Sequence, residues 1–276
     1  MLATAPALAS PGCGQAAPAE PPAVLDHAGR QREVIVAVSE GYDPAEARRL
    51  IVAFHGRTND AARVRRYYGL EAVDDGRSIF VYPQATRQAD GTFIWRQPED
   101  VVFVEAIIDH IGALYCIDRD RVFVVGHSLG ATFANTVACL RGDLVRGVGS
   151  VAGGISAQEC RGEAAALLIH NPEDRLVPLE EGRRAVEVLS SGKARPGGGN
   201  WFRTCTQFGP PEGTNPVVLC LHDHTVTSSG RAYPHQWPPG AAKALLEFFD
   251  GLPEGALNPT PDTPPAACRG SAFRSP

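Results

Sequence analysis

Short apolar runs alternate along this chain with longer segments of helical periodicity, and this alternation limits the folds open to it. Several runs are apolar on both faces, which is typical of strands in a parallel sheet covered by helices. The predicted strands are Glu33–Val38, Leu50–Phe54, Ser78–Tyr82, Arg121–Val125, Gly147–Val151, Ala166–Ile169 and Pro216–Leu221. The predicted helices are Val102–Leu114, Leu129–Leu140, Leu179–Leu189 and Ala241–Phe249. We therefore expect an α/β fold with one doubly wound, mostly parallel sheet and a ligand site at the carboxyl ends of its strands.

Composition narrows the classes of function. The 276 residues include 26 Lys plus Arg and 31 Asp plus Glu, which gives a net charge of −5. Without a block of basic residues, the chain lacks the electrostatic footprint of a nucleic-acid-binding protein. It also lacks an apolar stretch near the roughly 20 residues that a membrane span requires. A chain of this length buries a sufficient core without a metal, and we expect neither a metal nor another cofactor.

Both ends of the chain are rich in Pro and poor in periodicity. We predict a signal remnant and Pro/Ala-rich tail over residues 1–22, a catalytic domain over 23–252 and a Pro-rich tail over 253–276. Residues 1–10 carry an Ala-x-Ala-like pattern of small residues but no basic start and no full apolar core, so an Ala-rich unstructured terminus is the alternative. Seven cysteines indicate an oxidising compartment, and we expect a secreted or periplasmic protein.

One segment carries the sharpest chemical signal. The predicted strand Arg121–Val125 runs directly into Gly126-His127-Ser128-Leu129-Gly130, and a predicted helix follows. In G-x-S-x-G the serine occupies a strained strand-to-helix turn, and the flanking glycines avoid collisions with neighbouring backbone. The turn lifts the hydroxyl above the sheet and places a helix N-terminus under any developing negative charge. We predict that Ser128 is a nucleophile; the alternative is a serine that only caps the helix.

A serine nucleophile needs a base, and the base needs an orienting acid. In the α/β-hydrolase fold the acid and then the histidine follow the serine along the chain. Asp174 lies in a turn directly after the predicted strand Ala166–Ile169 and is the predicted acid, with Glu173 as its rival.

Only three histidines lie beyond this acid and past the last predicted strand. His235 sits in a Pro-flanked loop ahead of the final helix and is the predicted base, with His224 and His222 as alternatives. His222 and His224 are two residues apart and could also form a metal pair, but no third ligand at a fitting spacing accompanies them.

The oxyanion needs two backbone donors, the first from the loop after an early strand. The run Leu50–Phe54 leads into His55-Gly56-Arg57, and we predict the N–H groups of Arg57 and Leu129 as the pair. His55 is expected to bond within its own loop.

Longer motifs accompany these residues: Val52–Asp60, Tyr67–Glu71, Ile79–Gln84, Trp95, Tyr115–Asp118 and Arg121–Ser128. They resemble the secreted feruloyl esterase and polyhydroxybutyrate-depolymerase-like family of α/β hydrolases. The resemblance runs from about residue 12 to 249 and is nearest to the feruloyl esterases, which also begin with a Gly-Cys-Gly like residues 12–14. The resemblance implies the α/β-hydrolase fold. It places the family's nucleophile on Ser128, its acid on Asp174 and its base on His235. The family's oxyanion loop falls on Gly56 and Arg57.

The chain departs from the family pattern at three places. Ala131 stands where the family usually has Gly, Asn171 follows His170 where Gly is common, and Tyr233-Pro234 replaces two glycines. None of these changes removes a reacting group.

Four residues are predicted to line the substrate site: Gly56, His127, Trp95 and Trp237. The two tryptophans could equally be core residues.

The cysteine connectivity does not follow from the sequence. The positions of the cysteines relative to the predicted elements suggest three candidate pairs, of which the first is favoured. Cys205 and Cys220 flank a Pro/Gly-rich connection, and a bridge there would pin the loop leading toward His235. The other two candidate pairs are Cys139 with Cys160 and Cys13 with Cys116, which would leave Cys268 free.

The sequence therefore predicts a monomeric serine carboxylic-ester hydrolase whose partner is its ester substrate. The nearest resemblance favours a hydroxycinnamate ester on plant cell-wall polysaccharide, that is, a feruloyl esterase. Acetylated xylan and a hydroxybutyrate polyester are the alternatives, since the same machinery serves all three. A polymer-binding protein with a degenerate hydrolase fold would have lost a reacting residue, and none is lost here.

Overall fold

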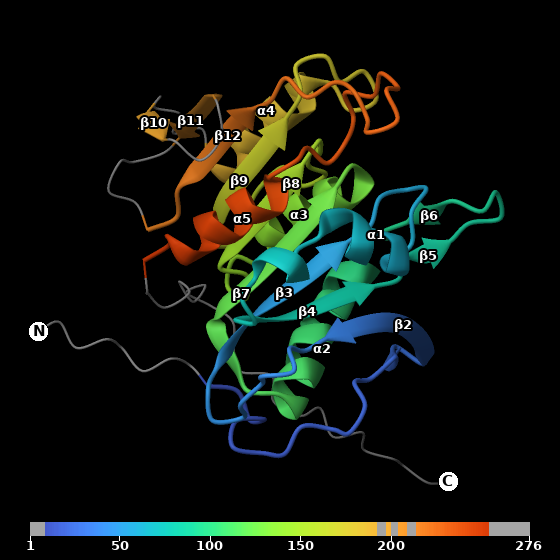
Figure 1. Ribbon diagram of the computed structural model, residues 1–276, viewed down its shortest axis with the longest axis vertical. Coiled ribbons are helices and arrows are strands. Elements are labelled where there is room, and N and C mark those ends of the chain that lie inside the picture. The colour runs from blue at the N-terminus through green and yellow to red at the C-terminus, as the bar shows by residue number, and fades with distance from the viewer. Residues whose placement is uncertain (1–8, 192–196, 200–203, 209–213, 254–276) are drawn as a thin grey trace, which may run out of the picture.

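The structure is a computed structural model, and it describes residues 9–191, 197–199, 204–208 and 214–253 (Figure 1). Most of the predicted signal remnant, almost all of the Pro-rich back tail and Cys268 lie outside these ranges. Within them, no helix has both the length and the apolar character needed to cross a bilayer.

The centre of the molecule is a sheet in which the described residues form ten strands (Figure 1). Their order is β1-β2-β4-β3-β7-β8-β9-β12-β11-β10, and the six strands from β4 to β12 run parallel. The antiparallel strands lie at the two edges. The bounds are β1 Val24–His27, β2 Arg30–Ala37, β3 Arg48–Phe54, β4 Ser78–Pro83, β7 Ile117–His127, β8 Gly147–Val151, β9 Ala165–His170, β10 Gly197–Gly199, β11 Thr204–Phe208 and β12 Val217–Leu221. A separate small hairpin joins β5 Thr86–Arg87 to β6 Phe93–Ile94.

Helices cover both faces of this sheet. The helical elements are α1 Ala61–Tyr68, η1 Glu71–Val73 (a 3-10 turn), α2 Glu99–Leu114, α3 Leu129–Leu140, α4 Leu179–Leu189 and α5 Ala241–Asp250. Alternate residues of β3 point to opposite sides: Val52 and Phe54 pack with α2, α3 and α4, whereas Ile51 and Ala53 pack with α1 and α5. This is the doubly wound, mostly parallel sheet that the two-faced apolar runs predicted.

The sequence located most elements closely. The bounds of α3, α4 and β8 are those predicted. Helix α2 begins earlier than predicted, at Glu99. Its first turn carries Glu99 and Asp100, and the apolar periodicity used for the prediction does not include these acidic residues. Helix α1 was missed, although Val64 and Tyr68 are buried on its inner face, Asp60 caps its first turn through the Arg63 N–H, and Gly69 ends it at φ 63°.

The front segment packs from Ala9 onward instead of hanging free as a tail. Ser10 is buried; its hydroxyl donates to the Tyr115 carbonyl at 2.8 Å and accepts from the Ile117 N–H at 2.9 Å. The backbone of Gly12 lies so close to Tyr115 that a Cβ at position 12 would come within 2.6 Å of it. A bridge between Cys13 and Cys116 fixes this contact covalently.

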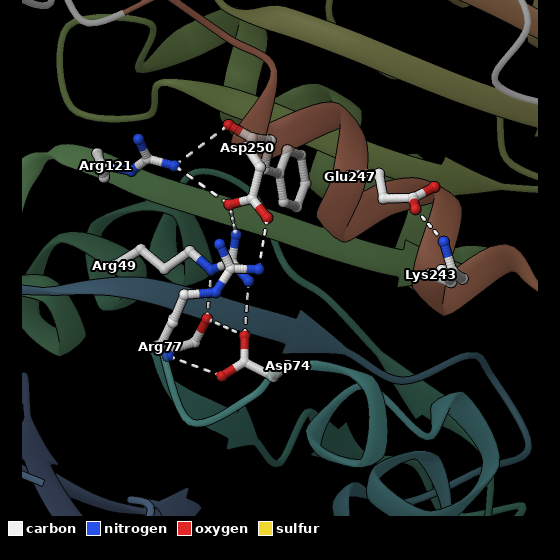
Figure 2. Close-up of polar contacts among 9 residues, drawn as sticks. Arg49, Asp74, Arg77, Arg121, Lys243, Glu247 and Asp250 are labelled. Atoms are coloured by element: carbon white, nitrogen blue, oxygen red, sulfur yellow. Dashed lines mark hydrogen bonds and ion pairs between the residues drawn. The ribbon is translucent and has the colours of Figure 1, made fainter.

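An ion cluster centred on the buried residues Arg49 and Asp74 lies at the amino-terminal edge of the sheet (Figure 2). Arg49 on β3 bonds Asp74 at 2.6 Å and Asp250 at the end of α5 at 2.5 Å. Arg77 and Arg121 also reach the Asp250 carboxylate. The cluster therefore ties the last helix to a central strand at the edge opposite the predicted site.

Candidate active site

The turn between β7 and α3 holds Ser128 in a conformation that few side chains adopt. Ser128 has φ 61° and ψ −126°, and its N–H donates to the Val151 carbonyl at 3.0 Å. A Cβ at Gly126 would lie 2.3 Å from Gly130, and one at Gly130 would lie 2.1 Å from the Phe54 carbonyl oxygen. The two glycines of G-x-S-x-G are therefore sterically required, and they let the turn press against the end of β3.

Ser128 meets a histidine and an aspartate at the carboxyl edge of the sheet. His235 Nε2 is 2.7 Å from Ser128 Oγ, and His235 Nδ1 is 2.6 Å from Asp174 Oδ2. His235 and Asp174 are each only 4% exposed. The structure thus brings together the three residues that the sequence singled out, in a linear chain of hydrogen bonds suited to proton transfer from the serine.

The surroundings of Asp174 keep it ionised. Burial alone would raise its pKa, but the hydrogen bond from His235 and the N–H groups of Leu176 and Val177 together lower the pKa below its ordinary value. These two N–H groups donate to Oδ1 at 2.9 and 3.1 Å. Glu173, the rival acid, is exposed. An ionised Asp174 can fix the tautomer of His235 and stabilise its protonated form.

The loop after β3 supplies a candidate oxyanion donor. A Cβ at Gly56 would lie 3.4 Å from Ser128 Cβ, so this backbone passes directly beside the serine. In the described residues, the N–H of Arg57 has no protein acceptor. The N–H of Leu129 lies in the first turn of α3, where helical N–H groups lack intrahelical partners. Arg57 directly follows Gly56, whose backbone passes beside Ser128, and Leu129 directly follows Ser128, so the two N–H groups remain the predicted oxyanion donors.

His55 bonds within this loop, as the sequence indicated. Its Nε2 accepts the Ala85 N–H at 3.0 Å, so its Nδ1 carries the proton and donates to the Gly56 carbonyl at 2.9 Å. In a trans peptide the C=O and the following N–H point in opposite directions. By holding the Gly56 carbonyl, His55 turns the Arg57 N–H away from itself. Burial lowers the pKa of His55 and keeps the ring neutral in this role.

His127 lies beside the proposed site residues without taking the place of the base. Its ring centroid is 4.9 Å from that of His235 and 5.9 Å from that of Tyr67. Burial, and then the nearby His235, lower the pKa of His127 to about 3. The ring is therefore neutral and packs one side of the site.

The two alternative bases, His222 and His224, lie in the segment that directly follows β12. Burial lowers the pKa of His222 to about 4, and its Nδ1 accepts the His224 N–H at 3.3 Å. His224 is half-buried and lines a cleft. Among the described residues, no three His, Cys, Asp or Glu side chains converge as metal ligands.

The two predicted tryptophans have different places. Trp95 belongs to the core: it is 6% exposed, stacks on Phe133 and donates its indole N–H to the His55 carbonyl at 3.0 Å. The prediction that Trp95 lines the substrate site is thus corrected: its ring is part of the core, and its indole N–H holds the His55 carbonyl in the loop after β3. Trp237 stacks on Tyr68 at 4.2 Å between ring centroids and also lines a cleft.

Two clefts flank the loop that carries His235. One of about 650 Å³ is lined by residues that include Asn59, Tyr67, His127 and Trp237. The other, of about 590 Å³, is lined by the acid turn and His235. Tyr233 lines both. Sequence reasoning gave no role to Tyr67 or Tyr233, because an isolated tyrosine in a motif or loop does not reveal whether it faces a cleft.

Three bridges lie within the described part of the chain, and they join the three candidate pairs. Cys13 bonds Cys116, Cys139 bonds Cys160 and Cys205 bonds Cys220. The bridge between Cys205 and Cys220 crosses from β11 to β12, the strand that leads into the loop of His235.

Ala131 fits where the resemblance leads one to expect glycine. Its Cβ is fully buried, and a Cβ at Gly153 would come within 2.4 Å of it. Because Gly153, in the loop after β8, has no side chain, the methyl group of Ala131 has room there.

Comparison with known proteins places the chain among esterases. It is 32% identical over 241 residues to a probable feruloyl esterase C of Aspergillus terreus, a match that covers 80% of this chain and 84% of that protein. It is also 32% identical to feruloyl esterase C of Emericella nidulans, covering 63% of this chain and 65% of that protein. No family model matches the chain.

A solved structure, the acetyl xylan esterase from Aspergillus awamori, superposes with a TM-score of 0.61 at 12% identity and covers 79% of this chain and 94% of the other. This likeness confirms the predicted α/β-hydrolase fold. The identity to the Aspergillus terreus protein over most of both chains shows that the protein is a carboxylic ester hydrolase that belongs to the feruloyl esterase family.

Proposed function

We propose that this protein hydrolyses hydroxycinnamate esters of plant cell-wall polysaccharide by an acyl-enzyme mechanism. The observation that carries the proposal is the hydrogen-bonded series from Ser128 through His235 to Asp174. The substrate class rests on the relatives named feruloyl esterase. Three disulfides support an extracellular site of action, since such bonds persist in oxidising compartments.

In the proposed first half-reaction, Ser128 Oγ attacks the ester carbonyl while His235 Nε2 takes its proton. The oxyanion that forms is stabilised by the N–H groups of Arg57 and Leu129. His235 then gives the proton to the departing alcohol oxygen, and the acyl group remains on the serine. In the second half-reaction water repeats the attack with His235 again as base, which releases the carboxylic acid and restores Ser128.

The test is turnover of methyl ferulate, acetylated xylan and a hydroxybutyrate oligomer by the wild type, Ser128→Ala and Ser156→Ala. Ser156 is an exposed serine in the loop after β8 and serves as the matched control. We expect methyl ferulate to be preferred, Ser128→Ala to lose at least about 10⁴-fold in kcat and Ser156→Ala to retain activity. Preference for either other ester would refute the substrate class, and full activity of Ser128→Ala would refute the mechanism.

A further inference from the structure

The acid turn, residues 171–177, and the loop of His235 are joined at one backbone carbonyl, that of His224. Asn171 directly follows β9 and is only 1% exposed, and its side-chain Nδ2 donates to this carbonyl at 3.0 Å. The side-chain Nε2 of Gln236 reaches the same carbonyl at 3.4 Å. Asn171 is three residues ahead of Asp174, and Gln236 directly follows His235. The His224 carbonyl therefore links the segment of the acid to the segment of the base.

Asn171 also shapes the turn that carries the acid. Its side-chain Oδ1 accepts the Glu173 N–H at 2.8 Å, and its backbone carbonyl accepts the Asp174 N–H at 3.1 Å. One side-chain atom thus faces an N–H donor and the other faces a carbonyl, so a single orientation of the amide satisfies both. An aspartate at this position would lack the donor, and the glycine that the resemblance leads one to expect would lack both groups.

The loop of His235 is fixed to the same segment by further bonds. The Nε2 of Gln236 also donates to the Tyr233 carbonyl at 2.8 Å, and the Tyr233 N–H donates to the Thr225 carbonyl at 2.7 Å. The residues on both sides of His235 are therefore bonded to each other and to residues 224–225. Where the imidazole lies relative to the acid turn then depends on how this segment is tied to that turn.

The bond from Asn171 extends the contact between two strands beyond their ends. The ladder between β9 and β12 reaches the His222 N–H, which donates to the His170 carbonyl at 3.0 Å. The side chain of Asn171 makes the next connection, between the two loops that follow these strands. A side chain that bridges these loops limits how far the acid can move from the base.

Resting on the proposed esterase function, we propose that Asn171 is a positioning residue that holds Asp174 and His235 at hydrogen-bond distance through the His224 carbonyl. The bond that it protects joins His235 Nδ1 to Asp174 Oδ2 at 2.6 Å. A displacement of about 1 Å at a reacting group can cost about 10²-fold in rate. Loss of the link should therefore slow the steps in which His235 moves a proton and leave binding of the ester nearly unchanged.

Two substitutions test the link by kinetics on methyl ferulate. Asn171→Ser keeps an oxygen that can accept the Glu173 N–H, but this side chain is too short to reach His224. We expect it to lower kcat about 10- to 100-fold and to change KM less than about 3-fold. Gln236→Met removes the second donor at similar size and should lower kcat by less, because its bond is longer. The double variant should lose less than the product of the single losses, since both donors act on one carbonyl.

Tyr42→Phe is the matched control. The Tyr42 hydroxyl accepts the Cys116 N–H at 2.7 Å beside the start of β7, at the opposite end of that strand from Ser128. This variant also loses one side-chain bond to the backbone, but it should retain kcat. An equal loss of kcat in Tyr42→Phe, or multiplicative losses in the double variant at the site, would overturn the proposal.

Proton nuclear magnetic resonance tests the link without turnover. The proton between His235 Nδ1 and Asp174 Oδ2 lies in a short, buried hydrogen bond and should give a low-field resonance. We expect this resonance in the wild type and in Tyr42→Phe, and we expect Asn171→Ser to lose it through faster exchange with water. A retained resonance or an unchanged kcat in Asn171→Ser overturns the positioning role. If the wild type turns over no ester, the proposed function is refuted, and the resonance still decides the role of Asn171.

Discussion

His55 illustrates how a buried, neutral imidazole can set the direction of a backbone donor. It accepts from the Ala85 N–H and donates to the Gly56 carbonyl, so its two nitrogens have fixed and different roles. A protonated ring could not accept from Ala85, and the lowered pKa that burial imposes prevents this protonation near neutral pH. The Gly56–Arg57 peptide is thereby held in one orientation before substrate arrives, as the proposed stabilisation of an oxyanion by the Arg57 N–H requires.

Replacing His55 should therefore slow the chemical step more than it weakens binding. We expect His55→Phe to lower kcat about 10- to 100-fold with little change in KM, because the Arg57 N–H loses its orientation. Steady-state kinetics on methyl ferulate give both parameters. Phe93→Leu is the control, since Phe93 contacts the His55 ring edge-on at 4.9 Å between centroids without bonding to it. Equal losses in the two variants would contradict a role for the hydrogen bonds.

At the scale of elements, α3 packs against the loop after β8. Ala131 on α3 stands where the family usually has Gly, and Gly153 in the loop leaves room for its methyl group. Ala131 fills space that a side chain at position 153 would need. The same loop is held to α3 by Thr132 and Thr136, whose hydroxyls accept the N–H groups of Gly154 and Ser156. The pair Ala131 and Gly153 therefore acts as one packing unit, and the two positions should not vary independently.

A double-mutant cycle measures this coupling. We expect Gly153→Ala to reduce the free energy of unfolding by about 1–3 kcal/mol through overpacking. Adding Ala131→Gly should restore part of the loss, although backbone atoms of Ala131 and Thr132 also lie 2.9 Å from the added Cβ. Denaturant unfolding of the two single variants and the double variant gives the coupling energy. Additive effects would show that the two positions do not share space.

The elements that the sequence predicted best are those with strong local causes. The elbow at Ser128 follows from two glycines whose neighbours leave no room for Cβ atoms, and such a constraint is visible in five residues. Helix α1 was missed because its arginines mask a narrow buried stripe. The position of Trp95 was not predictable, because an aromatic ring suits a cleft wall and a core equally until the packing around it is known.

At the scale of the whole molecule, several histidines are buried and neutral. Burial lowers the pKa of His127 to about 3 and that of His222 to about 4, and it also lowers those of His55 and His170. In an unfolded chain a histidine titrates at about 6.5. Between these values the unfolded state binds protons that the folded state does not, so stability is complete above about pH 6.5 and is lost as the pH falls below it.

The expected result is a steep loss of stability in mild acid. Between pH 6.5 and about 4, His127 and His222 should each remove about 1.4 kcal/mol of unfolding free energy per pH unit. Denaturant unfolding at pH 7, 6 and 5 measures the slope. His222→Gln should make the slope shallower by the share of one group, whatever it does to stability at pH 7. An unchanged slope in that variant would rule out His222 as a contributor.

The ion cluster at the amino-terminal edge has a consequence for the order of events during synthesis. Arg49 and Asp250 are 201 residues apart, and Asp250 follows the loop of His235 by a single helix. A nascent chain that ends before this last segment would already contain the turn at Ser128. It would still lack His235 and the ion pair between Arg49 and Asp250 that holds α5. We therefore expect the polypeptide to become a working hydrolase only when its final helix docks, in one late step rather than by degrees.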